Sequence, residues 1–308
     1  MGSHFTKYLR QHYPHYRVVV FDALTYAGNR DNLKDIVDPH YTFLQGTICD
    51  QRALDTIILE HKIDTIVNYA AETHVDRSIM DPRAFLQTDV IGTHTLLEAV
   101  RKHGIERLIQ ISTDEVYGDI ASGRVNEAAP FRPSSPYAAA KAGGDHLVHA
   151  YYRTYQTPVM VTHSCNFYGP NQYPEKLIPL FITNLLESKK VPVYGDGNQT
   201  REWIFVDDHC RAIDMILHCG RIGEAYNIGT GHEIRNIEIT KLILTLLGKD
   251  ESYIEYVQDR PGHDRRYALD RSKLTRELGW EPQVSFADGL KKTVEWYKQN
   301  EWWWKKLI

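Results

Sequence analysis

The sequence alternates short apolar runs with longer amphipathic stretches over its first 171 residues. Apolar runs of strand length cover residues 17–22, 41–49, 64–72, 107–118 and 157–170. Residues 50–62 and 83–104, which lie between them, carry apolar side chains at helical spacing. Strands that alternate with helices pair in parallel, because each crossover returns the chain to the same end of the sheet. The pattern predicts an α/β fold with a doubly wound parallel sheet.

The texture of the sequence changes after residue 171. Residues 172–308 combine helical stretches with shorter strands and include a loop rich in arginine near Arg265. We therefore expect two domains. Residues 1–171 form the doubly wound domain, and residues 172–308 mainly form a smaller α/β domain, with excursions of the chain back to the sheet.

The composition is that of an ordinary globular protein and argues against nucleic-acid-binding, membrane, secreted and metal-binding proteins. Of the 308 residues 42% are hydrophobic and 25% charged, and the net charge of −4 gives no sign of nucleic acid or an anionic membrane as partner. No apolar run reaches the ~18 residues of a spanning helix, and no secretory pattern opens the sequence, so we expect a cytoplasmic protein. The four cysteines and fifteen histidines lack the spacing of metal ligands, so no metal site is expected.

Two groups of polar residues carry the candidate chemistry. Tyr137 and Lys141 stand four residues apart in an alanine-rich helical stretch, which places a phenol and an ammonium on one helix face. A neighbouring cation favours phenolate and so lowers the pKa of the phenol. Thr113, Asp114 and Glu115 follow an apolar strand, at the edge where open α/β sheets bind ligands. A Tyr-x-x-x-Lys pair alone is frequent by chance, and acidic pairs after strands are often helix caps.

Seven motifs together resemble one enzyme family. They are NYAAETHVDRSI, ISTDEVYG, SPYAAAKAGGD, NFYGPNQYPEKLIP, GDGNQTREWIFVDDHCRAI, AYNIGTG and RPGHDRRYALD. Their order resembles the nucleotide-sugar branch of the extended short-chain dehydrogenase/reductases (the NAD-dependent epimerase/dehydratase family), and most closely its dTDP-glucose 4,6-dehydratases. The resemblance covers about residues 2–300. It implies a Rossmann-like, NAD-binding domain in residues 1–171 and binding of a nucleotide-diphosphate sugar, dTDP-glucose, mainly by residues 172–308.

The resemblance also implies a role for each candidate catalytic residue. Tyr137 would be the base on the sugar C4 hydroxyl, Lys141 would lower its pKa, and Thr113 would hydrogen-bond the oxygen while NAD takes hydride from C4. Glu115 would then remove the C5 proton. Asp114, as a protonated acid, would help the C6 hydroxyl leave as water before the hydride returns to C6. Adjacent carboxyl groups reach opposite protonation states through mutual repulsion and unequal burial.

Binding residues carry over in the same way. The implied cofactor contacts are Gly2, Asp22, Ile48, Ala70, Ala71, Ser112, Tyr137 and Lys141. The implied substrate contacts are Thr73, Asn166, Lys176, Arg201, Asn236, Arg260 and His263. A carboxylate such as Asp22 favours NAD over NADP, because it repels a 2′-phosphate, and arginines suit a pyrophosphate. The family also implies a homodimer formed through the helix at 83–104 and the helix that bears Tyr137.

The sequence departs from the family pattern in four places. Of the family's first strand and its Gly-x-x-Gly-x-x-Gly turn only Gly2 is present, which the resemblance implies is the last glycine of that turn. Thr47 replaces an aspartate, His163 an arginine and Phe167 an asparagine. Two alternatives stay open. One is an NAD-dependent nucleotide-sugar 4-epimerase or decarboxylase, against which the carboxyl pair favours elimination. The other is a truncated, inactive paralogue that binds sugar nucleotides.

Overall fold

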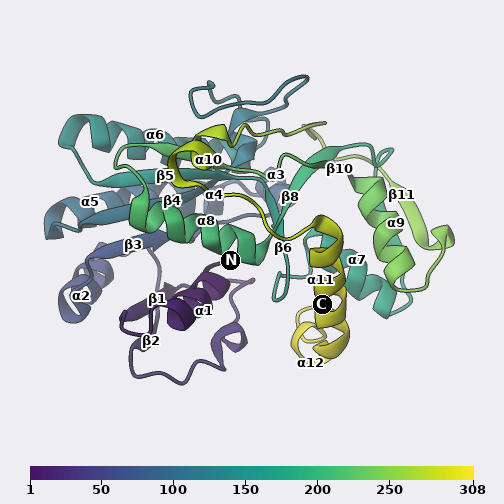
Figure 1. Ribbon diagram of the computed structural model, residues 1–308, viewed down its shortest axis with the longest axis horizontal. Coiled ribbons are helices and arrows are strands. Elements are labelled where there is room, and N and C mark those ends of the chain that lie inside the picture. Colours follow the sequence, from purple (N-terminus) through teal and green to yellow (C-terminus); the bar gives the residue numbers. More distant parts are fainter. The chain divides into compact units, whose positions relative to one another are not determined.

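The computed structural model describes residues 1–308 and contains two compact units. Unit 1 comprises residues 1–116, 135–163 and 213–226, and unit 2 comprises residues 117–134, 164–212 and 227–308. Figure 1 shows the order of the elements along the chain. The two units are interleaved in the sequence: the chain enters unit 2 at residue 117, returns to unit 1 at residue 135 and enters unit 2 again at residue 164.

Unit 1 is built on parallel strands. They are β1 (Val18–Asp22), β2 (Tyr41–Gln45), β3 (Thr65–Asn68), β4 (Arg107–Thr113), β5 (Val159–Ser164) and part of β9 (Ala225–Ile228). One sheet has the order β3-β4-β5-β9, and β1 and β2 form a separate parallel pair. The predicted α/β fold is confirmed.

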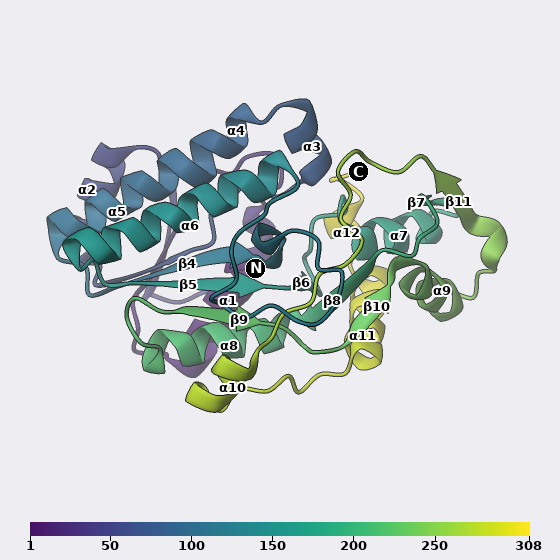
Figure 2. The same cartoon turned by 90° about the horizontal axis from the view of Figure 1, so that it is seen from above.

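Helices cover both faces of the four-stranded sheet. They are α1 (Gly2–His12), α2 (Gln51–His61), α3 (Val75–Met80), α5 (Thr93–His103), α6 (Pro136–Tyr155) and the later part of α8 (Val206–Cys219). Figure 2 shows α5 and α6 on one face and α1 and α8 on the other. Local signals set the helix ends: Ser135 caps α6, Pro136 is its first residue, and Gly104 at φ 66° ends α5.

The single helix predicted for residues 83–104 is interrupted. It consists of α4 (Arg83–Phe85), a π-helical segment η2 (Leu86–Gly92) and α5. At the end of η2, Thr93 Oγ1 donates a 2.7 Å hydrogen bond to the carbonyl oxygen of Asp89. Such segments are rare and often lie at functional sites. Apolar periodicity did not reveal it, because both helix types bury one face.

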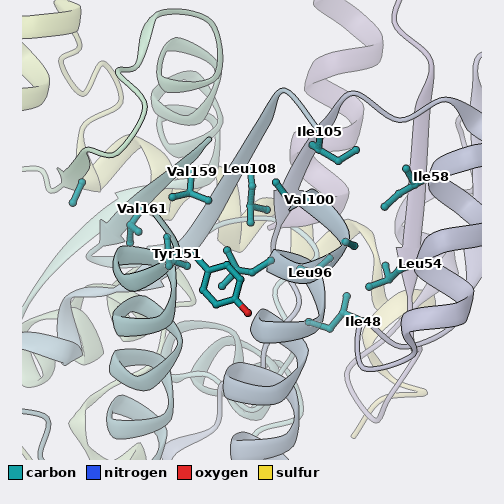
Figure 3. Packing of buried hydrophobic residues seen from close by; sticks show 14 residues of the cluster. Ile48, Leu54, Ile58, Leu96, Val100, Ile105, Leu108, Tyr151, Val159 and Val161 are labelled. Atoms are coloured by element: carbon teal, nitrogen blue, oxygen red, sulfur yellow. The ribbon is translucent and has the colours of Figure 1, made fainter. Parts of the chain in front are cut away.

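A hydrophobic cluster joins α2, α5 and α6 to the sheet. Leu97 and Val100 of α5 pack with Leu108 of β4, and all three are almost completely buried. Figure 3 shows Val100 and Leu108 converging with Tyr151 of α6. The Tyr151 hydroxyl donates a 2.5 Å hydrogen bond to Glu98. Helix α6 is therefore held firmly against α5 and the sheet.

Unit 2 combines short strands with helices. Its strands are β6 (Asn166–Tyr168), β7 (Val191–Tyr194), β8 (Thr200–Phe205), β10 (Glu233–Arg235) and β11 (Ile254–Val257). Its helices are α7 (Leu177–Leu186), α9 (Asn236–Leu246), α10 (Ser272–Leu278), α11 (Phe286–Gln299) and α12 (Glu301–Trp304). β8 pairs with β6 in parallel and with β10 antiparallel, and β7 pairs with β11 in parallel. The strand predicted for residues 157–170 is thus two strands, β5 and β6. No helix of the protein has both the length and the apolar character that crossing a membrane requires.

Candidate active site

Tyr137 and Lys141 lie in the first two turns of α6. Only 7% and 3% of their surfaces are exposed. The Lys141 ammonium donates a 2.8 Å hydrogen bond to the carbonyl oxygen of Ile111 in β4, and its Nζ is 3.8 Å from Oδ1 of Asp89. Tyr137 packs edge-on against Phe85, with the ring centroids 6.2 Å apart. The pair is therefore fixed between the end of β4 and the segment η2.

The strand-end group lies beside this pair. β4 ends at Thr113, and a 3₁₀ turn, η3 (Asp114–Tyr117), follows directly. Thr113 Oγ1 lies 3.2 Å from Asp114 Oδ1 and accepts the backbone N–H of Glu115 at 3.3 Å. The same hydroxyl hydrogen-bonds the Tyr137 phenol. Asp114 is buried, whereas Glu115 is partly exposed. One hydroxyl therefore contacts the phenol, the Asp114 carboxyl group and the backbone of Glu115, and the two acidic side chains differ in burial.

The pKa of the Tyr137 phenol is raised well above its usual value of 10.0. Burial is the largest cause, and the negative charges of Glu115 and Asp89 add to it, while the Thr113 hydrogen bond lowers the pKa. The sequence predicted a lowered pKa, because the motif shows the phenol beside the Lys141 cation. It does not show which carboxylates lie near the phenol in the fold. In the structure, burial and the surrounding carboxylates outweigh that cation.

Behind the pair lies a buried polar network. Ser112 Oγ donates a 2.6 Å hydrogen bond to Asp145 Oδ2, and His163 Nε2 is 3.3 Å from the same oxygen. All three side chains are at most 5% exposed. His163 is thus a buried partner of Asp145.

The other expected cofactor residues follow the carboxyl ends of strands in unit 1. Asp22 ends β1 and is exposed, and its carboxylate accepts the backbone N–H of Leu24 at 2.7 Å. Ile48 follows β2 and is buried, with 7% of its surface exposed. Ala70 and Ala71 follow β3 and are half-buried.

These features fit a dinucleotide such as NAD. Helix α1 begins at Gly2 and has no acidic residue in its first turn, so its N-terminal N–H groups suit a phosphate. The exposed Asp22 carboxylate suits the hydroxyls of a ribose. The hydroxyls of Ser112 and Tyr137 lie at the end of β4 and would contact the nicotinamide end.

Arg201 in β8 is a buried cation in unit 2. It is 5% exposed, and its guanidinium donates to the backbone carbonyl oxygens of Thr200, Asp264 and Arg265 at 2.8–3.3 Å. The guanidinium carbon lies 4.2 Å from the centroid of the Tyr267 ring. None of these partners is a carboxylate, so the positive charge is left for an anion.

Two further expected substrate residues neighbour Arg201. Asp259 Oδ1 is 2.5 Å from Nδ1 of His263 and accepts the backbone N–H of Arg260 at 2.9 Å. The pKa of His263 is lowered, first by burial and then by the charges of Arg260 and Arg201. Arg201, Arg260 and His263 are therefore close enough to interact electrostatically and form one basic group.

The remaining expected substrate residues are more dispersed. Asn166 lies in β6, Lys176 directly precedes α7, and Asn236 is the first residue of α9. The Oδ1 of Asn236 is buried without a hydrogen-bond partner. Thr73 belongs to unit 1 and follows β3.

Two buried carboxyl groups near Tyr137 and Lys141 were not identified from the sequence. Asp89 and Asp145 are 1% and 0% exposed and lie on η2 and α6. The available signal was an acidic residue inside an apolar helical stretch, such as Asp89 in TDVIGTH. A buried acid of this kind is seldom found without a partner.

Comparisons with known proteins agree with this geometry. Residues 1–293 match the family described as GDP-mannose 4,6 dehydratase. A dTDP-glucose 4,6-dehydratase of Streptomyces niveus is 51% identical over 292 residues, which are 94% of this chain and 86% of the relative. The crystal structure of DesIV, a dTDP-glucose 4,6-dehydratase from Streptomyces venezuelae with NAD and TYD bound, has a TM-score of 0.97 at 51% identity and covers 100% of this chain and 96% of its own. A UDP-glucose 4-epimerase from Thermus thermophilus in complex with NAD has a TM-score of 0.89 at 29% identity, with 97% and 96% covered.

Proposed function

The chain belongs to the GDP-mannose 4,6 dehydratase family, and from that premise we propose that it is a nucleotide-sugar 4,6-dehydratase that converts dTDP-glucose to dTDP-4-keto-6-deoxyglucose. Its similarity to dTDP-glucose 4,6-dehydratases supports this substrate. The observation that carries the reaction class is the pair Asp114 and Glu115, linked through Thr113 to the Tyr137 phenol. A 4-epimerase oxidises and reduces C4 without eliminating water and needs no such pair.

The first chemical step would use the phenol and its neighbours. Tyr137 accepts the proton of the sugar C4 hydroxyl as the C–H bond at C4 breaks, and Thr113 orients the oxygen. Lys141 stabilises the phenolate that this base requires. NAD, when bound, would supply the acceptor for the hydride from C4 and the source of the hydride for C6. Gly2, Asp22, Ile48, Ala70, Ala71 and Ser112 are the further residues that would hold it.

The elimination step would use the carboxyl pair. A ketone at C4 acidifies the C5 proton, which Glu115 removes as a carboxylate. Asp114 donates a proton to the C6 hydroxyl, which leaves as water. When hydride adds at C6, Glu115 returns its proton to C5, and the proton that Tyr137 took from the C4 hydroxyl balances the one that Asp114 gave up. The deeper burial of Asp114 supports this division, because burial favours the neutral form of a carboxyl group.

The basic group of unit 2 would bind the diphosphate of the sugar nucleotide. Arg201 and Arg260 supply positive charge and planar donors, which match phosphate oxygens. His263 and Asn236 add polar contacts, and the unpaired Oδ1 of Asn236 is an acceptor that suits an O–H or N–H of the sugar nucleotide and not its phosphate oxygens. Asn166, Lys176 and Thr73 are the remaining proposed contacts.

We also infer a cytoplasmic homodimer. Apolar side chains on α3 and η2 are exposed in the single chain, among them Met80 at 82%, Leu86 at 53% and Ile91 at 47%. A second copy would cover these side chains. Light scattering coupled to size exclusion gives the mass in solution, and a monomer would contradict this part of the proposal.

The proposed reaction is tested with purified protein, NAD and dTDP-glucose. The expected product is a 4-keto-6-deoxy sugar nucleotide, which mass spectrometry distinguishes from the substrate by the loss of one water. Conversion to an isomer of unchanged mass would indicate epimerisation. Absence of any conversion, with NAD bound stoichiometrically, would refute the dehydratase assignment.

A further inference from the structure

Asp89 is a buried carboxyl group that the proposed reaction leaves without a role. Its side chain has no exposed surface, and apart from a loose contact with the backbone N–H of Glu72 its carboxylate oxygens have no hydrogen-bond partner. The nearest cation is Lys141, whose Nζ is 3.8 Å from Asp89 Oδ1. A buried carboxylate with so loose a partner is costly for stability. Its position beside the proposed redox pair therefore suggests a role in the site.

The fold places Asp89 there through a close contact between η2 and α6. A Cβ at Gly144 of α6 would lie 2.5 Å from the carbonyl oxygen of Asp89, and one at Gly143 would lie 3.2 Å from Val90. Thr93 Oγ1 donates to the same carbonyl oxygen at 2.7 Å. Two glycines in the helix that carries Tyr137 and Lys141 thus allow the backbone that bears the carboxyl group to approach.

Charged groups from several elements face Asp89. Lys141 and Asp145 lie on α6, and Glu72 follows β3. Burial raises the pKa of Asp89 to about 7; Lys141 and the Glu72 backbone N–H oppose the rise, and the charges of Glu72 and Asp145 add to it. Ionised Asp89 in turn raises the pKa of Tyr137. The two groups are therefore electrostatically coupled, and Asp89 changes its charge near neutral pH.

We propose that Asp89 is a positioning residue whose charge sets how strongly the Lys141 cation favours the phenolate of Tyr137. The effect of Asp89 on catalysis rests on the proposed function, whereas the electrostatic coupling between Asp89, Lys141 and Tyr137 does not. With Asp89 neutral, the full charge of Lys141 acts on the phenol. With Asp89 ionised, its carboxylate compensates that charge, and the phenol holds its proton more tightly. Loss of the phenol proton likewise favours proton uptake by Asp89.

Asp89→Asn tests the coupling in the protein without substrate, because it removes the charge and keeps the size. The sample carries ¹³C at the hydroxyl-bearing ring carbon of tyrosine, and Tyr137→Phe assigns the resonance. The wild-type Tyr137 resonance should show an inflection near pH 7 that reports ionisation of Asp89, and D89N should lack it. Asp89→Glu should retain an inflection. A D89N resonance that keeps the wild-type inflection overturns the proposal.

The same variant has an expected effect on the reaction. With NAD and dTDP-glucose, the acid limb of the rate of NAD reduction should move about one unit toward lower pH in D89N, which is up to about tenfold in rate on that limb. The KM for the sugar nucleotide should stay the same. Asp55→Asn is the matched control, because Asp55 pairs with Lys102 at 2.6 Å on α2 and α5, away from Tyr137. A D89N profile identical to that of D55N contradicts the proposal.

Failure of this inference can be separated from failure of the proposed function. A wild-type protein that makes no keto sugar refutes the function, while the ring resonance still tests the coupling. If D89N does not fold, Lys141→Met tests the coupling from the other side. Loss of the cation should raise the midpoint at which the Asp89 carboxyl carbon titrates, and an unchanged midpoint would refute the coupling.

Discussion

Replacing Asp89 by asparagine should change the way in which stability depends on pH. Burial raises the pKa of this carboxyl group from 3.8 to about 7. Between these values the folded protein keeps a proton that the unfolded chain releases. The unfolded state then binds fewer protons, so the free energy of unfolding falls as pH rises through this window. Asparagine cannot ionise, and the free energy of unfolding of the variant therefore does not fall with pH in this way.

The size of the effect follows from the shift. A difference of about 3 pKa units corresponds to about 4 kcal/mol over the full window, and about 3 kcal/mol of this falls between pH 5 and pH 8. Urea unfolding, followed by circular dichroism at several pH values, gives the free energy of unfolding for D89N and wild type. The advantage of D89N over the wild type should grow by that amount from pH 5 to pH 8.

The control is another aspartate with the opposite shift. Arg265 and Asn198 hold the pKa of Asp196 below its usual range, so its contribution to stability is already complete at pH 5. Asp196→Asn should therefore differ from the wild type by a constant amount between pH 5 and pH 8. If the D89N difference is equally constant, Asp89 is ionised throughout that range and the reasoning about its burial is wrong.

Three further predictions concern separate groups. Glu115→Gln should still allow NAD to be reduced by dTDP-glucose, seen as NADH absorbance, but should block the loss of water; full product formation would refute its role as the C5 base. Arg201→Lys keeps the charge but loses the planar fork, and we expect at least a tenfold rise in the KM for the sugar nucleotide, whereas Arg265→Lys should have little effect; equal effects would refute the assignment. Burial lowers the pKa of His209 from 6.5 to about 3, so the unfolded state binds the extra proton and stability falls below pH 6.5. His209→Gln should remove roughly 3 kcal/mol of that loss between pH 6.5 and pH 4, measured by urea unfolding, and an unchanged acid slope would contradict it.

The features that local pattern determines were predictable from the sequence. Apolar periodicity placed β4 before Thr113, and the four-residue spacing placed Tyr137 and Lys141 on one helix face. The carboxyl ends of parallel strands meet at one edge of a sheet, which is why a strand-end group and a helical pair could be expected together. The structure brings Thr113 and Tyr137 within hydrogen-bonding reach.

The charge balance around the phenol was not predictable, because it depends on contacts between distant segments. Asp89 reaches Lys141 through a π-helical segment that packs on Gly144, and neither feature has a signal in apolar periodicity. For the same reason the raised pKa of Tyr137 could not be foreseen from the motif. The direction of a pKa shift depends on all neighbouring charges and on burial, and only one of those charges was visible in the motif.

This charge balance links the two proposed chemical steps. Glu115, Asp89 and Asp114 each raise the pKa of Tyr137 when they are ionised. The elimination step requires Asp114 as a neutral acid, and the neutral form also removes one of the charges that keep the proton on the phenol. The neutral form of Asp114, which can protonate the leaving hydroxyl, therefore also makes it easier for Tyr137 to lose its proton and act as the base of the oxidation. Glu115, which must be ionised to take the C5 proton, acts against that base, and its partial exposure to water reduces the cost by screening its charge. Unequal burial of adjacent carboxyl groups thus serves both steps of the proposed reaction.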